Sequence, residues 1–121
     1  MKLTGVMLGT DDAKKLSNFY TEVFGKPVFT DNNFFGFDVG GAMLMIGPHS
    51  DIKGVNESPA RSMVMIVTDD VAGDFKRISS IEGAKVVAEP YNPDPSNKTT
   101  WLSTIADPDG NYFQLASPWE M

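Results

Sequence analysis

The chain has 121 residues, of which 41% are hydrophobic and 21% charged, with ten Lys and Arg against sixteen Asp and Glu. This length and composition fit one domain with a buried core, and they exclude both a multidomain machine and a disordered chain. The net charge of −6 opposes binding to a phosphate backbone, so nucleic acid is not an expected partner.

The sequence has no long apolar segment, no cysteine and one histidine, which limits the location and the metal and redox chemistry that we expect. Residues 1–5 hold no apolar stretch of signal-peptide length, and the longest apolar run, residues 42–46, is too short to cross a bilayer. We therefore expect a cytoplasmic protein without a membrane partner. The sequence has no cysteine and a single histidine, His49, so disulfides, thiolate nucleophiles and sites built from several His or Cys are excluded.

An internal repeat is the main organisational signal. A shift of 58 residues places Thr10-Asp11-Asp12 on Thr68-Asp69-Asp70, and a shift of 69 places Gly41 on Gly110. Such self-similarity indicates two copies of one structural unit. The larger second shift predicts an eleven-residue insertion, which the proline-rich segment 90–98 can supply as a loop. This loop could cover one end of a binding site or be a plain surface insertion.

The first copy begins with a predicted strand over residues 3–8. A helix follows, because apolar residues recur at spacings of three and four over residues 13–24. Asp12 can cap its start, which is a better account of the Asp pair than a catalytic dyad, and Gly25 can end it. Strands over 34–39 and 42–46 then flank Gly40-Gly41, a dipeptide suited to a two-residue hairpin turn.

The second copy repeats this plan. A strand over 63–67 leads through Asp69-Asp70 into a helix with Val71, Phe75 and Ile78 on one face, and Gly83 follows it. Strands are expected over 85–88, 101–105 and 111–116. The sequence therefore predicts an α+β chain of two tandem βαβββ modules, residues 1–58 and 60–121, joined by a linker over 56–59.

Two segments carry a family resemblance that covers nearly the whole chain. The first is Asp12 with Phe19-Tyr20-Thr21-Glu22-Val23-Phe24-Gly25, and the second is residues 107–115, DPDGNYFQL. They resemble the first-helix and last-hairpin signatures of the vicinal oxygen chelate superfamily, which includes glyoxalases, bleomycin-resistance proteins and extradiol dioxygenases. The resemblance implies a single glyoxalase-like domain over residues 1–121, with curved mixed sheets that form cups, and a homodimer.

The resemblance also locates the family's metal site. In metal-using members four side chains hold a divalent ion, and the matching positions here are Gly5, Met45, Met63 and Gln114. Glycine offers no ligand atom, a thioether is soft and neutral, and an amide is uncharged, whereas Ni²⁺, Zn²⁺ or Fe²⁺ prefer imidazoles and carboxylates. We therefore expect no metal and no other cofactor.

The same four positions define which side of each predicted sheet would form the cup, because strand residues two apart face the same side. Five of the seven methionines fall on that side, and the repeat places aromatic and polar residues beside them. The opposite side should pack beneath the helices, through Val6, Leu8, Leu44, Ile46, Val64, Ile66, Phe113 and Leu115. The predicted ligand-binding residues are Met7, Phe34, Met45, Met63, Met65, Trp101, Ser103, Tyr112 and Gln114, with Ile105 on the same side.

These residues favour a metal-independent protein that binds an apolar or aromatic small molecule, because methionine repacks around varied partners. Alternatively, the methionines simply fill the space of a lost metal, and Gln114 only satisfies a backbone group. The other functional hypotheses are a lyase, isomerase or dioxygenase of the same superfamily, similar to lactoylglutathione lyase, with an altered metal site, and an interaction module. No residue pair identifies a catalytic acid or base, and His49 reads as a surface residue.

Overall fold

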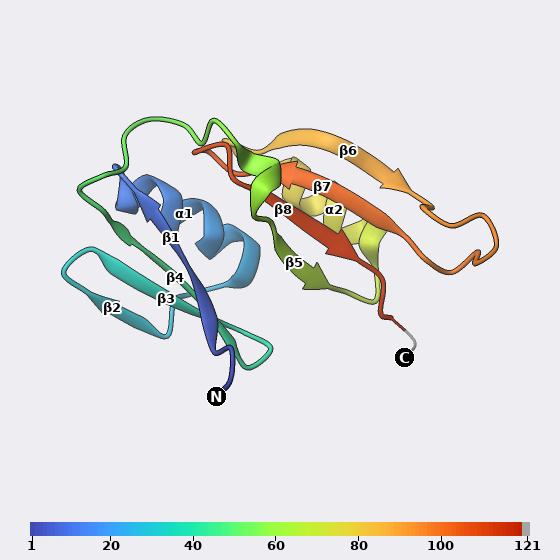
Figure 1. Cartoon of the computed structure of the whole chain (residues 1–121), viewed down its shortest axis with the longest axis horizontal. Coiled ribbons are helices and arrows are strands. Elements are labelled where there is room, and N and C mark those ends of the chain that lie inside the picture. Colours follow the sequence, from blue (N-terminus) through green and yellow to red (C-terminus); the bar gives the residue numbers. More distant parts are fainter. Residues whose placement is uncertain (120–121) are drawn as a thin grey trace. The chain divides into compact units, whose positions relative to one another are not determined.

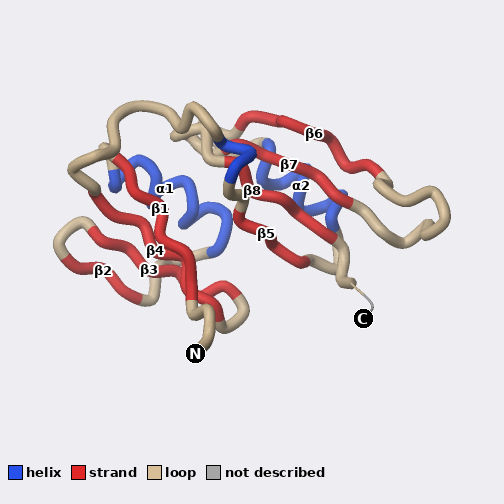
Figure 2. Tube along the Cα trace, viewed as in Figure 1, coloured by secondary structure: helices blue, strands red, loops and turns tan. Residues whose placement is uncertain are grey.

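A computed structural model describes residues 1–119 of the chain; the last two residues of the predicted second module lie outside the described residues. The chain divides into two compact units, Met1–Val55 and Asn56–Met121. Each unit contains one α-helix and a four-stranded mixed sheet (Figure 1). The predicted α+β class is therefore confirmed, and Figure 2 shows each helix lying across one face of its own sheet.

In the first unit the strand order is β1-β4-β3-β2, with β1 parallel to β4 and the other neighbours antiparallel. This arrangement places the first and last strands of the unit next to each other. The elements are β1 (Gly5–Thr10), α1 (Ala13–Phe24), β2 (Phe29–Asp31), β3 (Phe34–Val39) and β4 (Ala42–Pro48).

Helix α1 begins and ends where the sequence predicts. The Asp12 carboxylate accepts a hydrogen bond from the Lys15 backbone N–H at 3.1 Å, which satisfies one of the free amides of the first turn. Gly25 follows Phe24 with φ of 90°, a conformation that glycine adopts without steric cost. The buried residues Leu16 and Tyr20 lie on the side of the helix that packs against β3 and β4.

The sequence analysis did not predict strand β2, and it placed the start of β1 two residues too early. Strand β2 has three residues and joins β3 through Asn32 and Asn33, whose φ angles are 49° and 67°. Asparagine accepts this left-handed conformation more readily than most residues, so the Asn-Asn pair was the available hairpin signal. Strand β1 begins at Gly5 rather than residue 3, because its parallel register with β4 starts at the Gly5 and Met43 pair.

In the second unit the order is β5-β8-β7-β6, the same arrangement as in the first. Strand β6 is longer than expected and contains irregular pairing between Val86 and Tyr91, so the following loop is shorter than predicted. The elements are the 3-10 helix η1 (Pro59–Arg61), β5 (Val64–Val67), α2 (Val71–Ser79), β6 (Lys85–Tyr91), β7 (Leu102–Ala106) and β8 (Tyr112–Ala116).

The connection between β7 and β8 is organised by Asp107, which is 1% exposed. Its carboxylate accepts hydrogen bonds from the backbone N–H groups of Asp109 and Asn111 at 2.9 and 3.0 Å, and from the Asn111 side chain at 3.0 Å. A buried carboxylate with three donors stabilises one loop conformation. This loop fixes the register in which Ala106 lies opposite Tyr112.

No helix within residues 1–119 combines the length and the apolar character needed to cross a bilayer.

Candidate functional site

Three predicted site residues of the first unit lie on the side of its sheet that faces away from α1. In the strand register Met7 lies opposite Met45, and Met45 lies opposite Gly36. The alternate residues Leu44 and Ile46 are 4% and 0% exposed and form the core with α1. Because successive side chains point to opposite faces, Met7 and Met45 share the face without the helix, as does Phe34, which precedes Gly36 by two residues on β3.

The thioether ends on this face lie over bare backbone. A Cβ added to Gly36 would stand 2.9 Å from Met43 Cε and 3.0 Å from Met45 Sδ, so both side chains fold over the glycine. In the same way, a Cβ on Gly47 would stand 2.2 Å from the ring of Phe34. The result is a soft apolar layer of Phe34, Met43 and Met45 that covers two glycines of the sheet.

In the second unit Met65 and Gln114 occupy the equivalent face. They lie opposite each other on β5 and β8, and Gln114 lies opposite Thr104 on β7. Tyr112 is two residues from Gln114 and shares its side of the strand, and Met63 immediately precedes β5. Each unit therefore has its own methionine face, the side that bears Met7, Met43 and Met45 in the first unit and Met65 and Gln114 in the second.

The structure corrects the predicted orientation of Trp101, Ser103 and Ile105. Ser103 lies opposite Leu115 and Ile105 opposite Phe113, and all four are at most 2% exposed in the core covered by α2. Trp101 continues this register, because its N–H donates to Ser117 Oγ at 2.9 Å and its carbonyl accepts from the Ser117 N–H at 3.0 Å. These three side chains therefore lie on the side opposite to Gln114.

The physical reason is a one-residue difference between the two hairpins. Met43 and Tyr112 are equivalent in the repeat: four residues separate Met43 from its partner Asp38, whereas five separate Tyr112 from its partner Ala106. The register taken from the first unit therefore places β7 one residue away from its observed position. A displacement of one residue moves every side chain of a strand to the other face of the sheet. Leu102, Thr104 and Ala106 are the β7 residues on the methionine face.

One residue expected beneath a helix is exposed. Val6 retains 43% of its accessible surface, because β1 is an edge strand and α1 packs mainly over β3 and β4. Its repeat partner Val64, and Leu8 and Ile66 on the same strands, are half-buried.

Two cavities lie in the second unit. The first, of about 420 Å³, is lined by Tyr112 together with Arg61 and its neighbours Ser58, Pro59 and Ala60. Arg61 was not predicted as a site residue, because nothing in the sequence signalled that η1 would lie beside β8. The second cavity, of about 350 Å³, is lined by Trp101 and by the start of α2, on the other side of the sheet.

The four positions that correspond to the family's metal ligands do not fit a divalent cation. Gly5, Met45, Met63 and Gln114 supply one neutral amide and two thioethers, and within residues 1–119 no group of three His, Asp or Glu is placed to hold a metal. His49 is half-exposed on a loop, where its Nδ1 accepts a hydrogen bond from the Asp51 N–H at 3.1 Å. The donor set therefore gives a hard cation neither charge nor imidazole.

Comparison with known proteins agrees with the fold described above. The family model described as the Glyoxalase/Bleomycin resistance protein/Dioxygenase superfamily matches residues 2–115. None of the curated proteins compared with the chain matches it.

Among solved structures, a glyoxalase-related enzyme from Fulvimarina pelagi is 21% identical, with a TM-score of 0.77 over 98% of this chain and 88% of that one. A glyoxalase/bleomycin resistance protein/dioxygenase family enzyme from Burkholderia phytofirmans PsJN is 20% identical, with a TM-score of 0.76 over 97% of this chain and 98% of that one. TioX from Micromonospora sp. ML1 is 18% identical, with a TM-score of 0.69 over 97% of this chain and 98% of that one. At such identities the likeness establishes the fold alone, since one fold hosts many activities.

Proposed function

The chain belongs to the glyoxalase/bleomycin resistance protein/dioxygenase superfamily, and on this premise we propose that it is a metal-independent protein that binds an apolar or aromatic small molecule through the methionine faces of its units. The observation that carries the proposal is the position of Met43 Cε and Met45 Sδ over Gly36. Unbranched side chains that cover a glycine can move aside for a ligand without disturbing the sheet, because methionine has low rotamer barriers and a polarizable sulfur.

The exposure of the methionine face in each unit supports a binding surface rather than a closed core. Met7 and Met65 are 49% and 47% exposed, and Met63 is 39% exposed. A filled core would leave such residues nearly inaccessible, since close packing is the rule in protein interiors. Ligand contact with these thioethers would remove apolar surface from water, which is the main driving force for binding.

Polar groups on the same side of the second unit are suited to orient a ligand. Tyr112 and Arg61 line one cavity, and Gln114 lies two residues from Tyr112 on β8. A mostly apolar surface with a few placed donors and acceptors is typical of small-molecule sites. Trp101 and Ser103 are left out of this set, because their register places them on the opposite side.

Binding can be tested with 1-aminoanthracene, a neutral aromatic dye whose fluorescence rises in apolar surroundings. We expect saturable binding that is weakened several-fold by Met45→Gln at the methionine face of the first unit and by Met65→Gln at that of the second, since glutamine keeps the length of methionine but is polar. Gly36→Val should weaken binding further, because its side chain would occupy the space over which Met43 and Met45 fold. Val55→Gln is the matched control, as Val55 is an apolar residue that is 65% exposed in a loop.

Elemental analysis of the purified protein separates this function from the enzymatic alternative. We expect far less than one transition metal per chain, and dye binding that is unchanged by EDTA. One metal per chain, with binding lost on chelation, would instead support a lyase, isomerase or dioxygenase with an altered metal site. Dye binding unaffected by all three methionine-face variants would refute the proposal.

The proposal includes a homodimer in the cytoplasm. The dimer rests on the family's usual assembly, and the location rests on the cysteine-free sequence, since disulfides mark extracellular domains of this size. Light scattering coupled to size-exclusion chromatography should give twice the mass of the chain. A monomeric mass at micromolar concentration would contradict this part of the proposal alone.

A further inference from the structure

The cavity beside Trp101 is separate from the methionine face. It has a volume of about 350 Å³ and lies where the start of α2, Pro90 of β6 and the end of β8 meet. Trp101 and Ser117 form its wall from the side of the sheet that α2 covers. This volume is within the range of natural small-molecule sites.

The lining combines a flat aromatic surface with negative charge. Trp101 is 42% exposed, and the rings of Pro90 and Pro118 add apolar surface. Asp69 and Asp70 are the charged lining residues, and the described lining contains no Lys or Arg. Indole is the best side chain for a cation–π contact. The Trp101 ring and the two carboxylates therefore both favour a cationic ligand.

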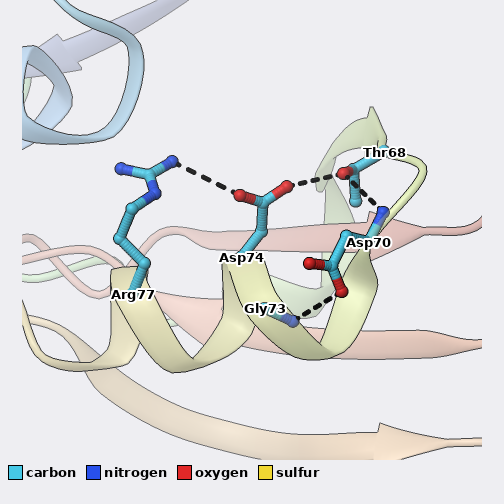
Figure 3. Close-up of polar contacts among 5 residues, drawn as sticks. All are labelled: Thr68, Asp70, Gly73, Asp74 and Arg77. Atoms are coloured by element: carbon cyan, nitrogen blue, oxygen red, sulfur yellow. Dashed lines mark hydrogen bonds and ion pairs between the residues drawn. The ribbon is translucent and has the colours of Figure 1, made fainter.

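The helix end itself is not an anion site. The Asp70 carboxylate accepts from the Gly73 N–H at 2.9 Å, and the Asp70 N–H donates to Thr68 Oγ1 at 3.1 Å (Figure 3). The first turn of α2 is thus already matched with a carboxylate, which offsets the positive end of the helix dipole. The exposed carboxylate of Asp69 therefore adds negative charge that the cap does not require.

Ser103 lies near this region but is not one of the residues that line the cavity. It follows Trp101 by two residues on the same side of β7 and is fully buried. Its Oγ has no hydrogen-bond partner among residues 1–119. A buried hydroxyl without a partner is costly and uncommon. Ser103 lies two residues from Trp101, which forms the wall of the cavity.

We propose that the Trp101 cavity is a second binding site, for a planar aromatic cation that stacks on the Trp101 indole and places its charge near Asp69. The net charge of −6 favours approach of such a ligand. The site lies on the side of β7 opposite to Thr104 and Gln114, so binding here does not require the methionine face.

Three probes of similar size and different charge test the site: N-methylquinolinium, neutral quinoline and 2-naphthalenesulfonate. In a Trp119→Phe background Trp101 is the sole indole, and its fluorescence should be quenched saturably by the cation at neutral pH. We expect the neutral probe to bind more weakly and the anion weakest. Affinity for the cation should fall as salt is raised, because an exposed charge pair is screened.

Substitutions separate the contribution of the Trp101 indole from that of the Asp69 charge. Binding to variants that lack the indole is measured by calorimetry, because their fluorescence signal is lost. Trp101→Leu should weaken cation binding about tenfold and Trp101→Phe less, while Asp69→Asn should weaken it about threefold and reduce its salt dependence. Asp51→Asn is the matched control, because Asp51 is an exposed carboxylate elsewhere.

Met45→Gln, which tests the methionine face of the first unit, should leave cation binding unchanged. The proposal for the Trp101 cavity and the proposed function can therefore be refuted independently. Equal affinity for all three probes, or cation binding unaffected by Trp101→Leu and Asp69→Asn, would overturn the proposal.

Discussion

The ring of Phe34 lies directly against the backbone of Gly47 on the neighbouring strand. A Cβ on Gly47 would stand 2.2 Å from Phe34 Cδ1 and 2.3 Å from Cε1, far inside van der Waals contact. The absence of a side chain at Gly47 therefore leaves room for the Phe34 ring on the methionine face of the first unit, two residues along β4 from Met45.

Gly47→Ala should therefore destabilise the protein by about 1–3 kcal/mol, the range found when a packed site receives an extra methyl group. Urea unfolding measures the change. In a Phe34→Leu background the same substitution should cost clearly less, because the smaller side chain can move away. An equal cost in both backgrounds would show that the ring does not cause the loss.

The two helix caps provide a second prediction. Asp12 and Asp70 accept hydrogen bonds from the third residue of their helices, Lys15 and Gly73. Asp12→Ala and Asp70→Ala should each lower the free energy of unfolding by about 1 kcal/mol, and the Asn variants should lose much less, because asparagine also caps. Asp69→Ala is the control and should change stability little. A loss at Asp69 equal to that at Asp70 would contradict the assignment.

The sequence was sufficient for the features that rest on local chemistry. The caps at Asp12 and Asp70 and the Gly40-Gly41 turn depend on single side chains or on glycine, and each is where the pattern predicts it. The two-fold repeat then implied the order of the elements. Local signals of this kind predict element type well, because they act through neighbouring residues.

Register in the second unit could not be predicted in this way. It depends on the Asp107 hydrogen-bond network, which makes the β7–β8 connection five residues long, and on irregular pairing in β6. Neither feature has a counterpart in the first unit from which the repeat was extended. A single residue of displacement was enough to move Trp101 and Ser103 from one face to the other, and so from one candidate site to another.

Loop residues 92–99 give a pH-dependent prediction through Asp94. Its carboxylate accepts from Ser96 Oγ at 2.6 Å and from the Ser96 N–H at 3.0 Å. The side-chain hydrogen bond first, and the backbone one second, hold the pKa of Asp94 below its ordinary value of 3.8. Because the folded-state pKa is lowered, the stabilisation of the loop is complete above 3.8 and is lost as pH falls through the lower folded value.

The Ser96 amide resonance in NMR spectra should therefore stay constant between about pH 5 and 7 and move only in strong acid. Ser96→Ala should raise the pKa of Asp94 toward 3.8, because the hydrogen bond from the Ser96 hydroxyl, the main cause of the lowered pKa, is lost. An Asp94 pKa that does not respond to Ser96→Ala would rule out this cause.

Two buried serines make opposite predictions about stability. Ser103 Oγ is buried without a partner among residues 1–119, so Ser103→Ala removes an unsatisfied polar group and should raise the free energy of unfolding by up to about 1 kcal/mol. Ser17 is equally buried, but its hydroxyl donates to the Lys14 carbonyl at 3.0 Å. Ser17→Ala loses that bond, worth about 1 kcal/mol, and regains part of it through the higher helix propensity of alanine.

Urea unfolding of the two variants, measured in parallel, should therefore give changes of opposite sign. A loss of stability in Ser103→Ala would mean that the hydroxyl has a partner in solution, such as a buried water. A gain of stability in Ser103→Ala would instead show that the hydroxyl is unsatisfied in the folded protein, and N-methylquinolinium binding should be unchanged, because Ser103 is fully buried and does not line the Trp101 cavity.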